Sequence, residues 1–79
     1  MDIRRITPEE IRKVNCIITP RFGWSYTIES ANETDDDTYH IVFSDYNKAN
    51  DEKTQKEVGK IVKKMFGAKA VYCFGTKLA

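Results

Sequence analysis

The sequence predicts a two-layer α+β fold, in which a three-stranded sheet packs against amphipathic helices in the order α-β-β-α-β. Two segments alternate apolar and polar residues as half-buried strands do, and another repeats apolar residues at helical spacing. Hydrophobic residues make up 41% of the 79 residues, which is enough for one small core. We therefore expect residues 1–79 to form a single domain with an antiparallel hairpin and a packed C-terminal amphipathic helix.

The first helix is marked by a capping box. Thr7 is the expected N-cap, Pro8 occupies the first helical position, and Glu10 lies three residues after the cap. Pro20 disfavours helical geometry at the residue before it. We therefore expect a short helix from Pro8 to about residue 15 or 16.

The next two elements are predicted to form an antiparallel hairpin. The apolar residues that alternate with polar ones are Trp24, Tyr26 and Ile28 in the first strand and Tyr39, Ile41 and Phe43 in the second. Because side chains alternate between faces, the aromatic side should point inward. Residues 30–37 are polar and acidic, so we expect a solvated connection there. Contacts of Trp24 with Phe43 or of Ile28 with Tyr39 would suit this hairpin.

The strongest helical pattern covers residues 51–66. Its apolar stripe consists of Val58, Ile61, Val62, Met65 and Phe66. Asn50 or Asp51 is the expected N-cap, and Gly67 is the expected left-handed C-cap. Gly59 lies at the edge of the stripe, where a close approach of the helix to the sheet would explain a glycine.

A last strand is expected over residues 68–74, and it is apolar on both faces. We expect it to be buried on both sides, with the second helix on one face and the first helix near an edge or on the other face. In the alternative, Tyr72 and Phe74 form an exposed platform flanked by Lys69 and Lys77. Nucleic-acid bases could stack on such a platform.

Lysines occupy the outer side of the helix over residues 51–66. This lysine face consists of Lys53, Lys56, Lys60, Lys63 and Lys64. It is either a solvated helix surface or, together with Arg4 and Arg5, a contact for phosphate groups. The helix contains no arginine, the residue best suited to reading base edges. Nucleic-acid binding by this face would therefore be weak and non-specific.

Charges are segregated along the chain, although the net charge is only +1. Residues 29–52 contain eight acidic residues and one lysine, whereas residues 53–79 contain seven lysines and one glutamate. Such segregation predicts oppositely charged surfaces that orient a partner. Asp35, Asp36 and Asp37 form either a solvated hairpin tip or an acidic docking loop for a basic partner.

No metal, cofactor or catalytic site is predicted. The aspartates lack the spacing and the distal glutamate of a calcium loop. His40, Cys16 and Cys73 are far apart in the sequence and match no zinc motif, so we expect both cysteines to be reduced and buried. No nucleophile elbow or phosphate-binding glycine loop is present, and we therefore expect no enzyme activity.

The sequence also suggests where the chain resides. No stretch approaches the ~18 apolar residues that a membrane span requires. The first ten residues contain no apolar run of the kind found in a signal peptide. We expect a cytoplasmic protein that does not contact membranes.

These observations favour a small non-enzymatic interaction protein that binds another macromolecule, and we expect that partner to be a protein. The adaptor or inhibitor type, as encoded by phages and mobile elements, suits a chain of this size. The candidate protein-binding residues are Asp35, Asp36, Asp37, Trp24 and Tyr46, the acidic ones guiding association and the aromatic ones anchoring it. The alternative is the weak nucleic-acid-binding module described above. A self-associating structural subunit is the third hypothesis.

Overall fold

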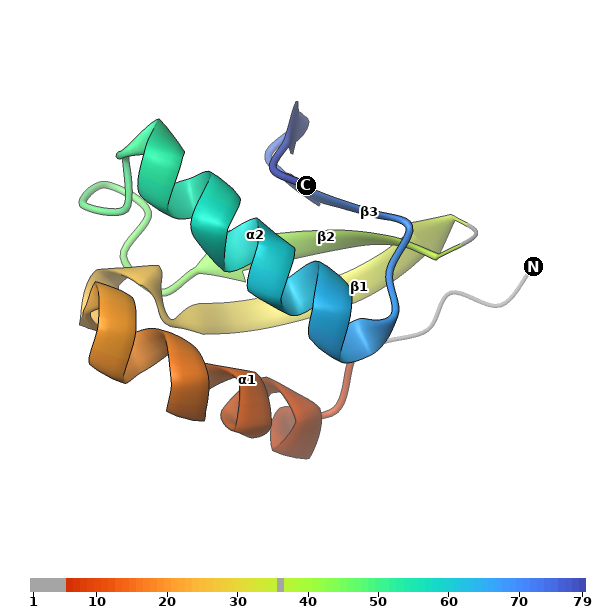
Figure 1. Ribbon diagram of the computed structural model, residues 1–79, viewed down its shortest axis with the longest axis horizontal. Coiled ribbons are helices and arrows are strands. Elements are labelled where there is room, and N and C mark those ends of the chain that lie inside the picture. The colour runs from red at the N-terminus through yellow and green to blue at the C-terminus, as the bar shows by residue number, and fades with distance from the viewer. Residues whose placement is uncertain (1–5, 36) are drawn as a thin grey trace.

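The computed structural model describes residues 6–35 and 37–79 (Figure 1). The elements are α1 (Pro8–Phe22), the 3-10 helix η1 (Trp24–Tyr26), β1 (Ile28–Asp35), β2 (Thr38–Phe43), α2 (Glu52–Phe66), β3 (Ala70–Cys73) and β4 (Thr76–Lys77). The predicted α+β class is confirmed. The sheet, however, has four strands in the described residues instead of the three that we predicted.

The four strands lie in the order β1-β2-β3-β4. β1 and β2 form an antiparallel hairpin, α2 connects β2 to the parallel β3, and β4 pairs with β3 in a second hairpin. β4 was missed because it is only two residues long and follows Phe74-Gly75. The asparagine-glycine and aspartate-glycine pairs that announce a tight hairpin in a sequence are absent there.

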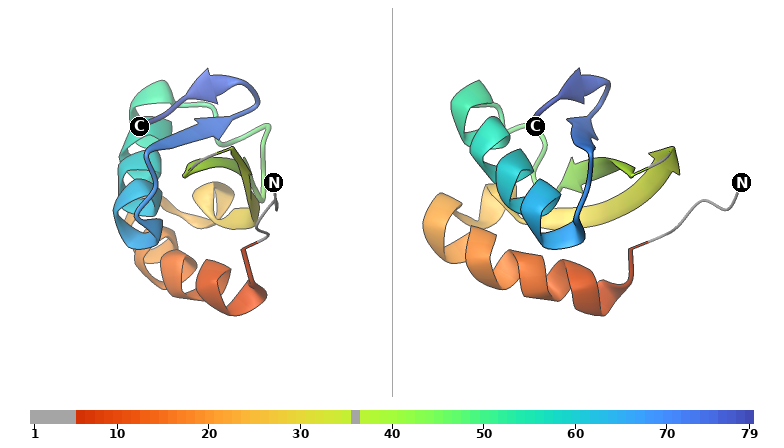
Figure 2. Two further views of the ribbon diagram at one scale, coloured as in Figure 1. Left: turned by 90° about the vertical axis from the view of Figure 1, so that its right-hand side faces the viewer. Right: turned by 45° about the vertical axis from the view of Figure 1, so that its right-hand side comes forward.

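Both helices pack on the same face of the sheet (Figure 2). α1 contacts β1 and α2, and α2 contacts β3. One cluster of buried residues fills the space between the helices and the sheet, and it includes Val14, Ile18, Tyr39, Ile41, Phe43, Val58, Val62, Val71 and Cys73. The expectation that the first helix lies near an edge agrees with its contact with the edge strand β1, whereas the alternative, a place on the opposite face, is wrong. The other face of the sheet carries no helix in the described residues.

α1 begins as predicted but continues well beyond its predicted end. The capping box is formed, because the Thr7 hydroxyl accepts from the backbone N–H of Glu10 at 3.2 Å and the Glu10 carboxylate accepts from the N–H of Thr7 at 3.2 Å. Pro20 lies inside the helix, and it has no N–H to donate to a backbone carbonyl one turn earlier. Because Pro20 is on the exposed side of the helix, that carbonyl is open to water. Burial of Ile18 and packing of Phe22 on the core favour continuing the helix to Phe22.

The first strand is shifted along the chain from its predicted position. Residues 24–26 form η1, so Trp24 does not lie in the sheet, and β1 continues through the polar segment that we expected to be a connection. In the observed register Ile28 pairs with Phe43, and Tyr26 contacts the Phe43 ring edge-on at 5.5 Å. β1 is largely polar because it is an edge strand with one solvated face, and Ile28 and Ala31 are its buried hydrophobic residues.

The second helix agrees with its prediction. Asp51 is the N-cap, and Gly67 closes the helix in the left-handed conformation with φ 65°. A Cβ on Gly59 would lie 2.5 Å from the Cβ of Leu78, so glycine permits a close approach of α2 to the segment after β4. Within the apolar stripe, Met65 is 41% exposed and lies outside the core.

A side-chain amide joins α1 to the outer edge of β1. Asn15 donates through Nδ2 to the carbonyl of Ile28 at 2.9 Å and accepts through Oδ1 from the N–H of Ile28 at 2.8 Å. Farther along the same edge, the carbonyl of Ala31 accepts from the N–H of Ile6 at 3.1 Å. These bonds occupy edge groups that would otherwise be open to another strand.

Candidate functional site

The uncovered face of the sheet, which we call the open face, is defined by the strand registers and by the alternation of burial along each strand. Its outward-facing residues are Ser30, Asn32, Thr38, His40, Val42, Ala70, Tyr72 and Lys77. These residues include no carboxylate and a single lysine. The side chains that the structure describes on the open face are therefore close to neutral, although charged residues make up 32% of the whole sequence.

Two rings are stacked at the centre of the open face. His40 and Tyr72 are register partners on β2 and β3, and their ring centroids are 5.4 Å apart with an interplanar angle of 16°. Both residues are half-buried. Because no helix covers this face, the expectation that the last strand is buried on both sides is wrong.

Phe74 adopts a conformation that is unusual for its residue type. It occupies the first central position of the β3–β4 turn with φ 48°, and Gly75 follows with φ 80°. Two positive φ values are typical of a type I′ turn, where asparagine or aspartate normally precedes glycine. A phenylalanine there carries backbone strain of about 1 kcal/mol or more, and its side chain is 61% exposed. Turn geometry does not explain this choice of residue, and the ring is not part of the buried core.

Phe74 contacts a second exposed aromatic residue. The ring centroids of Tyr46 and Phe74 are 4.5 Å apart, and the ring planes are tilted by 52°. The side chain of Tyr46 is 55% exposed. We call Tyr46 and Phe74 the aromatic pair. Since Tyr46 follows β2 and Phe74 follows β3, the pair lies where these two parallel strands end.

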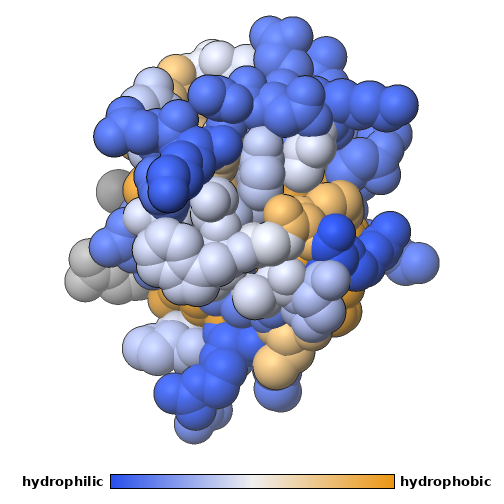
Figure 3. Space-filling model, turned by 90° about the vertical axis from the view of Figure 1, so that its left-hand side faces the viewer, coloured by the Kyte–Doolittle hydropathy of each residue, from blue (hydrophilic) through white to orange (hydrophobic). Residues whose placement is uncertain are grey.

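Trp24, 64% exposed, lies at the same end of the molecule. η1 is tied to the residues after β2, because the N–H of Asp45 donates to the carbonyl of Ser25 at 3.4 Å. Figure 3 views this end and shows hydrophobic residues in a few separate areas between hydrophilic ones. The two aromatic residues that we predicted as anchors, Trp24 and Tyr46, are thus both exposed at one end.

The predicted acidic loop forms the turn at the opposite end of the β1–β2 hairpin. We call the carboxylates that the structure describes at this turn, those of Glu33 and Asp37, the acidic tip. The carboxylate of Glu33 accepts from the N–H of Asp37 at 3.1 Å, and Asp37 is exposed with φ 55°. Asp36 and the side chain of Asp35 lie outside the described residues. Lys69 is close by, since its N–H donates to the carbonyl of Asp37 at 2.7 Å.

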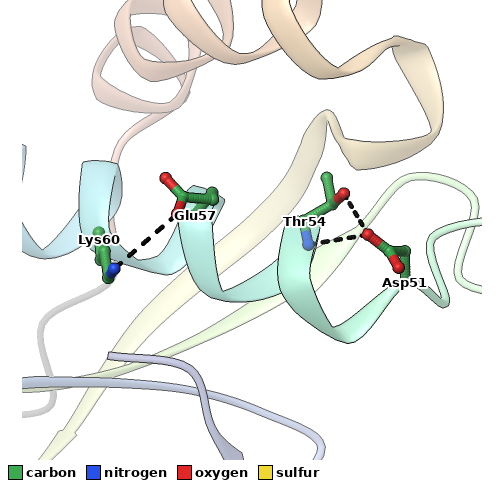
Figure 4. A network of polar contacts seen from close by, with 4 residues as sticks. All are labelled: Asp51, Thr54, Glu57 and Lys60. Carbon is green, nitrogen blue, oxygen red and sulfur yellow. Dashed lines mark hydrogen bonds and ion pairs between the residues drawn. The ribbon is translucent and has the colours of Figure 1, made fainter.

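All five residues of the lysine face are exposed on α2. Lys60 forms an ion pair of 3.8 Å with Glu57, and both side chains are largely solvated (Figure 4), so this pair adds little stability. A hollow of about 540 Å³ lies at the end of the helix and is lined by Lys60, Lys63, Lys64, Gly67, Ala68 and Ala79. Lysines in the last turn also interact favourably with the helix dipole. Arg4 and Arg5 lie outside the described residues.

The N-cap of α2 is the clearest electrostatic feature of this helix. Oδ2 of Asp51 accepts from the hydroxyl of Thr54 and from its backbone N–H, the latter at 3.0 Å (Figure 4). The bond from the Thr54 hydroxyl, followed by the one from the backbone, lowers the pKa of Asp51 below its usual value of 3.8.

The cysteines differ in their surroundings. Cys73 is buried on the packed face of the sheet, and burial raises the pKa of its thiol. Cys16 is exposed on α1, so the expectation that both cysteines are buried is wrong for this one. Residues 6–35 and 37–79 contain no group of three or more His, Cys, Asp and Glu side chains that could hold a metal ion. None of the helices described is long and apolar enough to cross a membrane.

Sequence reasoning identified Tyr46 as an anchor but not its contact with Phe74. It weighed Phe74 only together with Tyr72, which instead stacks on His40. The signal that would have found the aromatic pair is the Phe74-Gly75 dipeptide at the end of a short strand, since an exposed hairpin turn rarely begins with phenylalanine.

Comparisons of the chain with protein-family models, with curated proteins and with solved structures found no match. The candidate site therefore rests on the geometry of the chain itself.

Proposed function

We propose that this chain is a non-enzymatic protein-binding module of the adaptor or inhibitor type, and that it binds its partner through the open face and the aromatic pair. The observation that carries the proposal is the combination of positive φ and exposure at Phe74. A strained backbone together with a largely exposed ring costs stability, and this is understandable when the ring is needed by a partner. Exposed aromatic residues in such positions are typical hot spots of protein interfaces.

The composition of the open face supports a protein partner over a nucleic acid. A strand of nucleic acid requires several cations for its phosphates, and the described open face offers only Lys77. Its serine, threonine, asparagine, histidine and tyrosine side chains suit the mixture of hydrogen bonds and apolar contacts found in protein interfaces. The acidic tip at one end would repel a phosphate backbone.

Affinity capture with matched variants tests the proposal. The wild type, Phe74→Asn and Met65→Gln are each immobilised and exposed to lysate of the organism that encodes the chain, with and without nuclease. Phe74→Asn removes the ring but keeps a residue that tolerates positive φ. Met65→Gln removes an exposed apolar residue from α2, on the helical side of the sheet.

A protein retained by the wild type and Met65→Gln but lost with Phe74→Asn supports the proposal. Equal retention by all three proteins contradicts it. Loss of the retained material after nuclease treatment would instead favour nucleic acid.

The lysine face supports a second candidate function, weak and non-specific nucleic-acid binding, because its five side chains are all exposed along one helix. Its test is retardation of labelled DNA or RNA at about 50 mM salt that disappears by about 200 mM. Replacing Lys60, Lys63 and Lys64 by glutamine should abolish such retardation. Unchanged retardation would place the contact elsewhere.

A further inference from the structure

One row of side chains crosses the open face from edge to edge. Each of the four strands contributes one residue, and the register pairs place them in the order Asn32, His40, Tyr72 and Lys77. We call these four residues the cross-strand row. Neighbouring strands lie about 4.8 Å apart, so the row is about 15 Å long. Its centre is the stack of His40 on Tyr72, and Lys77 forms its end on the edge strand β4.

The cross-strand row carries one positive charge and no carboxylate. Lys77 is exposed, and within residues 6–35 and 37–79 its ammonium group forms no ion pair. The other three members, an amide, an imidazole and a phenol, can each donate a hydrogen bond. A carboxylate placed over the row would therefore find a cation and several donors. A basic group would instead be repelled by Lys77, and the described side chains of the open face offer it no carboxylate.

The aromatic pair lies beside the cationic end of the cross-strand row. Phe74 follows Tyr72 by two residues, which span at most about 7 Å of chain. The loop that carries Tyr46 adds no net charge, because it also contains Asp45 and Lys48. The Asp45 carboxylate accepts from the backbone N–H of Lys48 at 3.3 Å and is thereby held within the loop. Two exposed rings in contact suit a large aliphatic or aromatic side chain, whereas a charged group there would lose hydration.

The edges of the sheet offer less to a partner segment than the open face does. On β1, the amide of Asn15 occupies both the N–H and the carbonyl of Ile28. The carbonyl of Ala31 accepts from the N–H of Ile6 on the same edge. At the opposite edge, β4 is only two residues long. Few backbone groups are therefore open to an added strand, and recognition falls to the side chains of the open face.

From this arrangement we infer that the partner presents a short segment with an acidic side chain over the cross-strand row and a large apolar side chain against the aromatic pair. This inference rests on the proposed function and specifies the chemistry of the partner. Positions two apart in an extended segment, or three to four apart in a helix, give a separation of about 5–7 Å. Pairing of the carboxylate with Lys77 orients the segment, and burial of the apolar side chain on Phe74 slows its dissociation.

A displayed library of random peptides about twelve residues long, selected for binding to the wild-type chain at low salt, tests the inference. Enriched peptides are then measured against Phe74→Asn, Lys77→Gln and the charge reversal Lys77→Glu. Lys13→Gln removes the same charge from the exposed surface of α1 and is the matched control for Lys77→Gln. Met65→Gln is the control for Phe74→Asn. Circular dichroism and thermal unfolding establish that each variant is folded.

The enriched peptides should share an acidic residue and a large apolar residue two to four positions apart. Their affinity should fall about tenfold or more with Phe74→Asn and several-fold with Lys77→Gln, while both controls bind as the wild type does. The effect of Lys77→Gln should fade as salt rises, because it is electrostatic. Replacing the acidic residue of a peptide by lysine should weaken its binding to the wild type and restore its binding to Lys77→Glu, since these two positions face each other.

Each other outcome has a defined consequence. Peptides that depend on Phe74 but lack the acidic residue, bind Lys77→Gln as tightly as the wild type, or are not rescued by the charge reversal overturn the inference and leave the proposed function standing. Enrichment of no peptide, or only of peptides insensitive to Phe74→Asn, overturns both. Binding of a labelled single strand of about twelve nucleotides that is lost with Phe74→Asn overturns both in favour of nucleic acid.

Discussion

The two faces of β2 consist of alternate residues of one short strand, yet they differ in their surroundings. Tyr39, Ile41 and Phe43 are almost completely buried beneath the helices. Their neighbours His40 and Val42 are half-exposed on the side that carries no helix. Burial of the packed face therefore contributes most to the free energy of unfolding. Residues of the open face can be substituted without large loss of stability. An exposed residue that is costly to the fold, such as Phe74, then requires an explanation by function.

The largest contrast is expected between two phenylalanines. Phe43→Ala removes a buried ring that contacts Tyr26, and it should lower the free energy of unfolding by about 3–5 kcal/mol. Phe74→Asn removes an exposed ring from a left-handed turn position, and it should leave stability within about 1 kcal/mol of wild type, because relief of the backbone strain offsets loss of the ring contact with Tyr46. Urea unfolding of the two variants measures both values.

A stability loss at Phe74 comparable to that at Phe43 would contradict this division between the faces. It would make Phe74 a structural residue and would remove the observation on which the proposed function depends.

The next largest effect is expected at the bond between α1 and the edge of β1. Asn15→Ala removes two hydrogen bonds to the backbone of Ile28 and leaves partly buried groups without partners, so stability should fall by about 2 kcal/mol. Lys13→Ala, on the exposed side of the same helix, is the matched control and should change stability little. Equal effects of the two substitutions would show that the amide does not hold the helix to the strand.

A smaller effect is expected where α2 meets the C-terminal segment. Gly59→Ala adds a methyl group that would lie 2.5 Å from the Cβ of Leu78. The resulting overpacking outweighs the helix propensity of alanine and should cost a net of about 1 kcal/mol. In a double-mutant cycle, Leu78→Gly should reduce the cost of Gly59→Ala, because it removes the contacting atom. An additive cycle would contradict this cause.

The difference between the two faces also explains what the sequence could and could not predict. The elements that pack on the core can be predicted from the sequence. Burial of one side produces a regular spacing of apolar residues in α2 and β2, and capping residues mark where α1 and α2 begin. β1 was misplaced because an edge strand needs few apolar residues, and residues 30–35 carry only Ala31. The C-terminal end of α1 was missed because tertiary packing overrides the local effect of Pro20.

The candidate site was less predictable than the fold for the same reason. Exposed aromatics such as Trp24 and Tyr46 can be named from the sequence, but their neighbours depend on which strands become adjacent. The contact of Tyr46 with Phe74 arises only because β3 lies beside β2 and ends in a tight turn. No local pattern near either residue contains that information.

The smallest effect is expected from an exposed polar cap, in contrast to the partly buried amide of Asn15. The hydrogen bond from the Thr54 hydroxyl, together with the one from its backbone, lowers the pKa of Asp51 in the folded chain below the usual value of 3.8. Since the folded-state pKa is depressed, the stability that this carboxylate contributes is fully present above the unfolded-state pKa and is lost as the pH falls through the lower, folded-state value. Asp51→Asn can still cap the helix but does not titrate. The free-energy difference between wild type and Asp51→Asn, measured by urea unfolding from about pH 6 to about pH 2, should therefore shift against the wild type toward the acid end. A difference that stays constant over this range would show that the charge of Asp51 does not contribute to the cap.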